Sequence, residues 1–480
     1  MEWNKLNKPI PAPTLNPLLK PTNVDLTIAQ PTNLELTPRT LTEDMINEIL
    51  FRTPVKSLIR FRCVSKSWLL RTLHPKFISM HLNHCILCND KHLLCHIYKY
   101  DVVNKSCWEL VAYLGLRGPV MPVLRIEKNR ASKCDYPRKI NFCDFSKQMV
   151  LAGSINGVMC LTISGVMCFS KYKEMKGRSV ALWNPAINMW KLIRFPERKS
   201  RFDRLDVMSV GLGFDKGAGD YKIVRIVPVV RPPGFEEYCW SRVEIYSANR
   251  DIWTDFEKRG YVPFWPKLPN CNFIIKDCPY WVGADRLPGD LTPFNPNENE
   301  MLASIDPCTG LYKKVRYPNF VKNLCTSLNP LKWKDSLALL IQSPGECPNS
   351  IVDMYVLDES TKNWTKMYTI GEHQFDGLRI PQCLTTGEIV FETWKGDILH
   401  ADNRTPYFWN PETSDNFIRK RGLATTDPLW YESYSHIESL VCVKGMEVIG
   451  KEDDHKKKTK PRKDWTEMLS KDFESLLHLN

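Results

Sequence analysis

The sequence lacks the patterns of the common enzyme classes and any segment suited to a membrane. It contains no Gly-x-Ser-x-Gly nucleophile motif. The Gly-rich run 211–219 lacks the Gly-Lys-Ser/Thr of a phosphate-binding loop and is followed by a strand pattern. No run reaches about 18 apolar residues, and residues 1–20 hold four Pro and no apolar signal core. We therefore predict a non-catalytic protein that needs no cofactor and does not enter a membrane.

Neither the charge nor the cysteines form a recognisable cluster. The formal net charge of +12 is spread along the 480 residues, which makes nucleic-acid binding a weak interpretation. The 17 cysteines are an odd number without the regular spacing of a disulfide scaffold. Reduced thiols suit the cytoplasm or the nucleus, where we expect the protein to work.

One group of cysteines invites a zinc interpretation. Cys85 and Cys88 are followed by Cys95 and His96, but the interval of six residues is shorter than the ~12–20 of common zinc patterns. Neighbouring residues of a strand also point to opposite faces, so Cys95 and His96 would not converge. We predict buried structural cysteines and no metal site.

The first 84 residues contain two regions of different character. Residues 1–40 hold seven Pro and one aromatic residue, which predicts a disordered leader. From residue 41 the apolar period is helical, and Thr42 is a suitable helix cap. Pro54 breaks the pattern, and Pro75 is expected to end it. We predict a domain of three short helices over residues 41–84.

Residues 85–450 read as a large all-β domain. Apolar residues alternate in runs such as 221–226 and 336–341, with Gly, Pro, Asn and Asp between the runs. Five segments repeat an apolar strand, a polar turn and an aromatic residue at intervals of 50–60 residues, as propeller blades do. A β-sandwich is the alternative. The five aromatic residues are Trp190, Trp253, Tyr312, Trp364 and Phe417.

The tail, residues 451–480, combines a basic run with an amphipathic pattern. The pattern begins near Trp465 and predicts a terminal helix, packed on the β domain or bound in a partner's groove. The basic run is either a nuclear-import signal or a solvated hinge. Its charged residues are Lys456, Lys457, Lys458, Lys460, Arg462 and Lys463.

The run from Leu41 to Trp68 resembles an F-box, and the order of later motifs resembles the same plant family, whose members carry an F-box-associated or kelch-type C-terminal domain. These motifs are Asn156-Gly-Val-Met-Cys-Leu161, Leu182-Trp-Asn-Pro185, Gly211-Leu-Gly-Phe-Asp215, Asp220-Tyr-Lys-Ile-Val-Arg225, Val243-Glu-Ile-Tyr246 and Trp364-Thr-Lys-Met367. Thr42 replaces the family's usual Pro, and the Gly-Gly doublets of kelch repeats are absent. The resemblance implies an α+β multidomain chain, a small helical F-box followed by a β-propeller-like domain.

The resemblance also implies a function. The F-box would bind a Skp-type adaptor, which joins a cullin and a RING subunit, and the β domain would hold a protein target for ubiquitination. Pro54 and Val55 lie at a helix junction and are expected to be exposed contact residues, whereas Phe61 and Trp68 are expected in the F-box core. The adaptor-binding candidates are Leu41, Met45, Ile49, Leu50, Pro54, Val55, Leu58 and Val64.

Two other functions remain open from the sequence. An F-box protein can act outside the ligase as a carbohydrate or ligand receptor, with Trp265, Trp281 and Trp430 as candidates for stacking on a sugar. The basic tail could alternatively bind nucleic acid, which would give a steep salt dependence.

Overall fold

The computed structural model describes the helical region and most of the β domain. The described residues are 41–88, 91–101, 106–114, 120–127, 148–164, 179–197, 199, 202–205, 208–229, 240–255, 261–268, 270–284, 300–323, 327–344, 350–373, 377–383, 389–394, 405–409, 412, 419–420 and 429–448. The chain divides into two units, residues 1–49 and 50–480, with the boundary inside the first helix. The leader, Phe417 and the tail from residue 451 lie outside the described residues.

The helical region contains four helices, not the three that were predicted. They are α1 (Glu43–Phe51), α2 (Val55–Phe61), α3 (Lys66–Leu73) and α4 (Pro75–Leu87). Pro75 starts a helix instead of ending one, because the first turn of a helix needs no N–H donor and the fixed φ of Pro suits it. The Nδ1 of His74 accepts a hydrogen bond from the backbone N–H of Lys76 (3.2 Å) and caps this helix.

Polar caps and aromatic pairs fix the short helices. The backbone N–H of Met45 donates to Thr42 Oγ1 (3.4 Å), so Thr42 caps α1 as predicted. Ser65 caps α3 in the same way, accepting from the N–H of Trp68 (3.2 Å). Trp68 also packs edge-on against Phe61, with 5.2 Å between ring centroids. These contacts hold α2 and α3 together over a small buried core.

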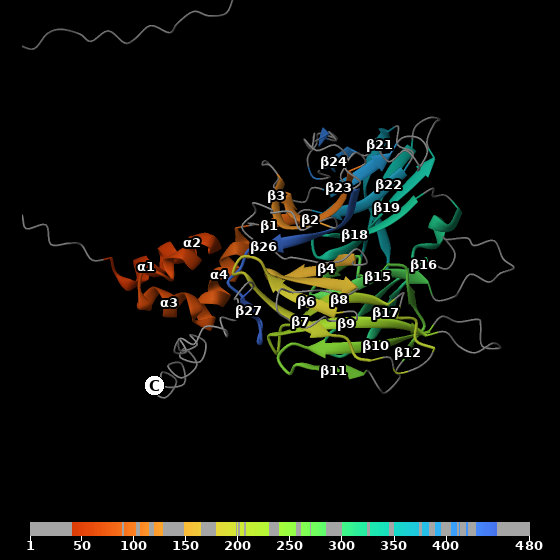
Figure 1. Cartoon of the computed structure of the whole chain (residues 1–480). Helices are drawn as coiled ribbons and strands as arrows, with labels where there is room; N and C mark the ends of the chain where they lie inside the picture. The colour runs from red at the N-terminus through yellow and green to blue at the C-terminus, as the bar shows by residue number, and fades with distance from the viewer. Residues whose placement is uncertain are drawn as a thin grey trace, which may run out of the picture. The chain divides into compact units, whose positions relative to one another are not determined.

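The β domain consists of six sheets in the part of the chain that the structure describes, and we number them I to VI (Figure 1). Sheet I contains β26 (Leu429–Ile437), β1 (Lys91–Asp101), β2 (Ser106–Leu114) and β3 (Val120–Glu127). Sheet II contains β27 (Glu447–Val448), β7 (Met189–Arg194), β6 (Ser179–Asn184), β5 (Val158–Ser164) and β4 (Gln148–Ile155). Sheet III contains β11 (Ile252–Asp255), β10 (Trp240–Ser247), β9 (Asp220–Val229), β8 (Ser209–Asp215) and the short β12 (Tyr261–Val262).

The other three sheets follow in chain order. Sheet IV contains β13 (Trp265–Pro266), β14 (Phe273–Ile275), β15 (Cys278–Ala284), β16 (Glu300–Ile305) and β17 (Tyr312–Val315). Sheet V contains β18 (Ser327–Trp333), β19 (Ser336–Pro344), β20 (Ser350–Leu357) and β21 (Trp364–His373), preceded by the 3₁₀ turn Asn319–Asn323. Sheet VI contains β22 (Gly377–Cys383), β23 (Ile389–Trp394), β24 (Thr405–Trp409) and β25 (Arg419–Lys420).

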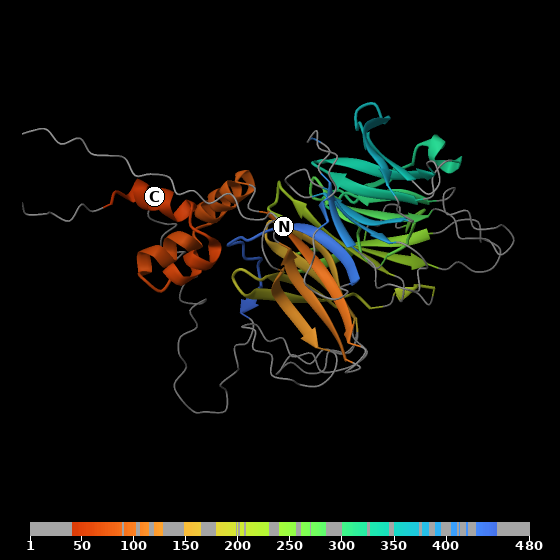
Figure 2. The same ribbon diagram turned by 90° about the horizontal axis from the view of Figure 1, so that it is seen from above.

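The innermost strands of the sheets contact one another in a closed cycle. β26 contacts β4, β4 contacts β8, and β8 contacts β15 of sheet IV. The cycle continues from β14 to β18, from β18 to β22, and from β22 back to β26. A sandwich would pack two sheets face to face, whereas this cycle is the arrangement of a β-propeller with each sheet as one blade. Figure 2 shows the sheets succeeding one another in this way.

The last two described strands close the propeller. β26 pairs antiparallel with β1, so that Ile437 faces Lys91, and it completes sheet I from the inside (Figures 1 and 2). β27 then pairs with β7 and extends sheet II on the outside. Segments more than 300 residues apart in the sequence therefore share one sheet, and the first blade cannot form without the last strands of the domain.

The predicted hairpin repeat is present in sheets II to V. Each aromatic residue is the first or second residue of the fourth strand of its sheet, counted from the inside, and pairs with the residue seven positions earlier. The pairs are Trp183 with Trp190, Tyr246 with Trp253, Ile305 with Tyr312, and Leu357 with Trp364. Two positions before each aromatic residue the backbone has positive φ, at Asn188, Asp251, Gly310 and Lys362. The same turn geometry thus recurs in four sheets, although only one of these turns has Gly at that position.

Two of the repeat tryptophans also join neighbouring sheets. Trp253 Nε1 donates to the backbone oxygen of Arg194 at the end of sheet II (2.9 Å). Trp364 Nε1 donates to the backbone oxygen of Arg316, just after sheet IV (3.3 Å). The repeat therefore has a structural role, because it places an indole donor on each of these outer strands within reach of the preceding blade.

Candidate functional site

An exposed row of apolar side chains begins just before α1 and continues along it. Met45 and Ile49 lie four residues apart on the same side of the helix, and Leu41 lies two residues before the helix begins. The exposed fractions of Leu41, Met45 and Ile49 are 53%, 54% and 51%. Large apolar side chains that recur on one exposed helical face are typical of a surface that binds a partner.

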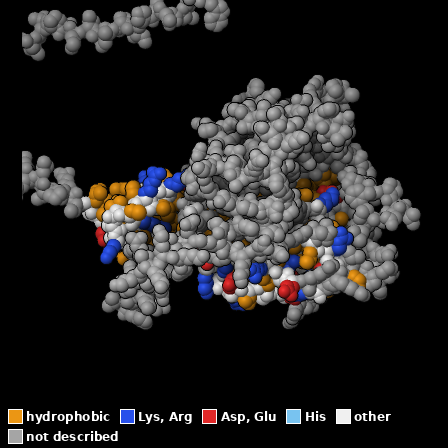
Figure 3. Space-filling model, in the orientation of Figure 1, with side chains coloured by type: hydrophobic (Ala, Val, Ile, Leu, Met, Phe, Trp, Pro, Cys, Tyr) orange, Lys and Arg blue, Asp and Glu red, His pale blue; other side chains and the backbone are white. Residues whose placement is uncertain are grey.

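Two further adaptor-binding candidates are exposed beside α2. Pro54 precedes the helix with an extended backbone, and its side chain is exposed. Val64 follows the helix and has an exposed fraction of 66%. The space-filling view shows hydrophobic side chains on the surface of the helical region (Figure 3).

The other three candidates are buried within the chain. Leu50 and Leu58 have an exposed fraction of 0%, and that of Val55 is 2%. The prediction that Val55 is exposed beside Pro54 is therefore wrong, because Val55 and Leu58 lie three residues apart and both face the core. Phe61 and Trp68, which were expected in the core, pack on each other and are only partly buried.

Two of the motifs of the β domain contact the segment that follows β26. Asn156 and Gly157 both have positive φ and form the tight turn between β4 and β5. A Cβ on Gly157 would come within 2.7 Å of the backbone oxygen of Ile437. In the next motif, Asn184 Nδ2 donates to the backbone oxygens of Ser439 (3.0 Å) and Val441 (2.7 Å). Both motifs thus hold the C-terminal segment against sheet II.

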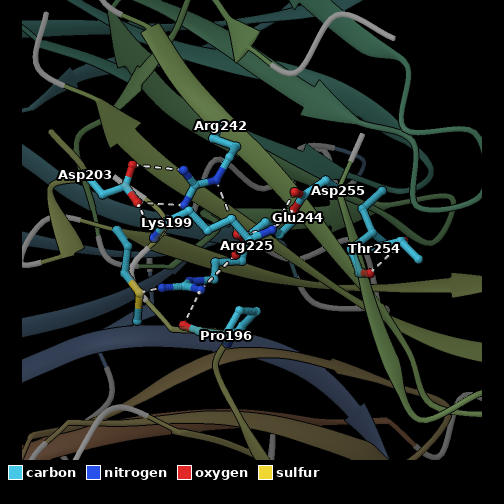
Figure 4. Close-up of polar contacts among 10 residues, drawn as sticks. Pro196, Lys199, Asp203, Arg225, Arg242, Glu244, Thr254 and Asp255 are labelled. Carbon is cyan, nitrogen blue, oxygen red and sulfur yellow. Dashed lines mark hydrogen bonds and ion pairs between the residues drawn. The ribbon is translucent and has the colours of Figure 1, made fainter. Parts of the chain in front are cut away.

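Two other motifs supply a buried network of charges in sheet III (Figure 4). Arg225 on β9 donates to Glu244 Oε2 (2.7 Å), and Arg242 on β10 donates to Glu244 Oε1 (3.2 Å). Arg242 also makes two hydrogen bonds of 2.9 Å to the carboxylate of Asp203. Lys199 is ion-paired with Asp255 and lies 3.6 Å from Glu244.

This network fixes the segment that links sheet II to sheet III. Asp203 accepts from Arg242 and also from the backbone N–H of Lys199 (3.1 Å). Arg225 Nη1 lies 3.4 Å from the backbone oxygen of Pro196, and its guanidinium lies over the ring of Phe195 at 4.8 Å. Because paired buried charges require exact partners, the network holds the described residues of this segment, 195–197, 199 and 202–205, in one conformation.

Burial and ion pairing act in opposite directions on the pKa values of the two arginines. Burial lowers the pKa of Arg225 from its usual 12.5, and the charge of Glu244 offsets part of that effect. Burial also acts to lower the pKa of Arg242, but the hydrogen bonds with Asp203 and the charge of Glu244 outweigh it and raise this pKa. The arrangement is suited to holding a loop, because its carboxylates are paired with the guanidinium groups of Arg225 and Arg242.

Of the three tryptophans that were predicted to stack on a sugar, Trp265 is half-buried, and the side chain of Trp430 lies outside the described residues. Trp281 is completely buried in β15, which argues against the predicted role in sugar stacking. Cys85 is buried on α4, with its Sγ 3.6 Å from His81 Nδ1. Cys88, just after α4, is exposed, so the prediction that it is buried is wrong. No group of three or more His, Cys, Asp or Glu side chains among the described residues is arranged to hold a metal. None of the described helices is long and apolar enough to cross a membrane.

Comparison with protein families agrees with this architecture. Residues 40–77 match the F-box domain. Residues 158–442, more than half of the chain, match the F-box associated beta propeller domain. The chain belongs to the F-box-associated β-propeller family. The plant F-box resemblance and the propeller fold predicted from the sequence are thereby confirmed.

Relatives of this F-box-associated propeller include plant F-box proteins of Arabidopsis thaliana. F-box/kelch-repeat protein At3g23880 is 25% identical over 218 residues, 45% of this chain and 51% of the relative. F-box protein At4g22390 is 25% identical over 346 residues, 68% of this chain and 73% of the relative. The chain thus spans about half the length of the first relative and almost three quarters of the second.

The buried network and the closing strand of this F-box-associated propeller were not predicted from the sequence. The motifs around Arg225 and Glu244 did identify the family, and alternating charged and apolar residues within a strand were the available signal. Nothing local in the sequence indicates that Asp203 pairs with Arg242, 39 residues away.

Proposed function

We propose that this chain is the substrate-recognition subunit of an SCF-type (Skp–cullin–F-box) ubiquitin ligase. Its F-box binds a Skp-type adaptor, which connects it to a cullin and a RING subunit, and its propeller binds the protein that is to be ubiquitinated. The observation that carries the proposal is the exposed row of Leu41, Met45 and Ile49 inside the segment that matches an F-box.

The exposed row of apolar side chains needs a partner to cover it. Three half-exposed large side chains, two of them on the nine-residue α1 and one just before it, leave apolar area in water that a partner can remove. A stable interface buries ~1,200–2,000 Å² in total and depends on a few such side chains. The row supplies these contacts from one face, and the exposed Pro54 and Val64 are further candidates.

The contribution of this subunit to the reaction is proximity. It would hold a lysine of the target close to the activated ubiquitin and so raise the effective concentration of the two reactants. The chain itself would form no covalent intermediate. It would act in the cytoplasm or the nucleus.

The test is co-purification of the full chain with a Skp-type adaptor, comparing wild type with Met45→Ala/Ile49→Ala. Both side chains are exposed, so we expect the fold to be unchanged and adaptor binding to fall at least tenfold. Leu50→Ala would be a poor choice, because Leu50 is fully buried and its truncation would destabilise the helices.

Leu311→Ala is the matched control, since Leu311 is an exposed apolar residue (65%) of the propeller. It should bind the adaptor as the wild type does. Undiminished binding by the double variant of α1 would refute the proposed docking surface, and a folded wild-type chain that binds no adaptor would refute the ligase role.

A further inference from the structure

The last helix of the helical region, α4, carries two His–Cys pairs (Figure 1). His81 and Cys85 form the first pair, and His84 forms the second with Cys88, the C-cap residue of the helix. Residues four apart on a helix lie on the same side of it, so each histidine reaches the cysteine that follows it by one turn. The structure therefore pairs each cysteine with a histidine, whereas the zinc pattern considered in the sequence joined Cys85 with Cys88.

The first pair is buried and its hydrogen bonds are complete. His81 and Cys85 have exposed fractions of 1% and 8%. The Nε2 of His81 lies 3.0 Å from the backbone oxygen of Thr53, and its Nδ1 lies 3.6 Å from the Sγ of Cys85. Because a backbone oxygen can only accept, Nε2 of a neutral ring carries the proton and Nδ1 accepts from the thiol. This pair has a structural role, since it fastens α4 to the turn that precedes α2.

The second pair is accessible to solvent. His84 is half-buried and Cys88 is exposed. The Sγ of Cys88 lies 3.4 Å from Nε2 of His84 and 3.9 Å from its Nδ1. Neither side chain makes another hydrogen bond or an ion pair with any residue that the structure describes. A thiol is a weak donor, so this contact leaves both groups able to bind a ligand.

The separation of the two ligand atoms suits a metal ion. Zinc binds thiolate sulfur at about 2.3 Å and imidazole nitrogen at about 2.0–2.1 Å, which in a tetrahedral site places the two atoms about 3.5 Å apart. The observed distance between Sγ of Cys88 and Nε2 of His84 is 3.4 Å. Thiolate and imidazole are also the ligand types that zinc and similar ions prefer. Two ligands four residues apart on one helix are a common way of binding zinc.

The backbone holds the two residues in this relation. Cys88 has helical backbone angles (φ −74°, ψ 0°), and its N–H donates to the backbone oxygen of His84 (2.9 Å). The free carbonyl groups at the C-terminal end of a helix give it a partial negative charge, which favours a cation there. The end of α4 thus combines a preformed ligand pair with a favourable electrostatic potential.

We propose that His84 and Cys88 form a binding site for a transition metal ion of the zinc class on the last turn of α4. Cys88 binds as the thiolate and releases its proton to solvent, and water takes the other positions around the ion. The site has two protein ligands, so it lies outside the groups of three or more that were sought among the described residues. It also goes beyond the sequence, from which no metal site was predicted, and it is independent of the proposed ligase role.

The experiment measures protection of individual cysteines by Zn²⁺ in the full chain. Iodoacetamide alkylates accessible thiols over a zinc titration, and peptide mass spectrometry reads the extent at each cysteine. We expect saturable protection of Cys88, because a metal-bound thiolate is a poor nucleophile. Cys63 is the matched control, since it is exposed and has no histidine four residues away, and its alkylation should not change. Mg²⁺ should protect neither cysteine, because it prefers oxygen ligands.

Three variants test the contribution of the histidine. His84→Asn should raise the zinc concentration needed for half protection of Cys88 about tenfold or more. His84→Cys replaces one soft ligand with another and should keep the protection, which separates loss of a ligand from a general disturbance of the helix. Asn83→Ala changes the neighbouring exposed residue and should behave as the wild type does. Equal protection of Cys63 and Cys88, no protection of either, or unchanged protection in His84→Asn would overturn the proposal.

Discussion

The F-box helices and the propeller use their motif residues in opposite ways. In the helices, the motif leaves Leu41, Met45 and Ile49 about half exposed. In the propeller, the motif residues Asn184 and Glu244 are completely buried and hydrogen-bonded. An exposed motif indicates a partner, whereas a buried motif indicates how the fold is assembled. The propeller motifs therefore identify the family without locating the target.

The largest expected effect comes from removing the strands that close the propeller. A chain that stops after residue 428 lacks β26, so that β1 loses one of its two paired strands and β4 and β22 lose their contacts with β26. We expect it to lose the cooperative thermal unfolding of the β domain, because the first blade and the contacts on both sides of it cannot form. The measurement is calorimetry of the purified chain.

A chain that stops after residue 448 is the control. It keeps β26 and β27 and should unfold within a few degrees of the full chain. If the shorter chain unfolded at the same temperature, the closing role of β26 would be wrong. The chain that stops after residue 428 should still bind the adaptor if the helices fold without the propeller. That result would show that the two regions fold and function independently.

An intermediate effect is expected from breaking the charge network of sheet III. Arg242→Ala would leave Asp203 without its two 2.9 Å hydrogen bonds and would also remove a partner of Glu244. Loss of one partner of a buried ion pair typically costs about 3–5 kcal/mol, since the remaining charge stays buried. Urea unfolding of wild type and variant measures the change in the free energy of unfolding.

The control for this change is Arg250→Ala, which removes an exposed Arg from a turn of the same sheet. Its effect should stay within about 0.5 kcal/mol. Similar losses in both variants would show that the buried network does not contribute specifically. Adaptor binding should be equal in both, because neither residue belongs to the F-box.

The smallest effect is expected from the indole donors that join neighbouring blades. Trp253→Phe keeps an aromatic ring against Tyr246 and Phe195 but removes the hydrogen bond to the backbone oxygen of Arg194. We expect a loss of about 1 kcal/mol in the free energy of unfolding. Trp364→Phe removes the longer bond of 3.3 Å and should cost no more. A neutral Trp253→Phe would mean that the repeat aromatics act through packing alone.

Much of the fold could be predicted from local patterns. The helix cap made by Thr42 and the aromatic hairpin repeat both depend on residues close together in the sequence, and both are present. The fourth helix was missed because Pro75 is compatible with either the end or the beginning of a helix. The helical period also marked Leu50, Val55 and Leu58 as apolar without showing that they face inward.

The sequence by itself determined the order of the domains, the helical and β character of each, and the repeated hairpins, because these follow from periodicity and turn chemistry over short distances. Only the tertiary structure decided which apolar residues of the F-box remain exposed, that β26 completes the first sheet, and that Asp203 pairs with Arg242. These outcomes depend on contacts between residues far apart in the chain. The free energy of such contacts comes from burial and pairing in three dimensions, which no local pattern records.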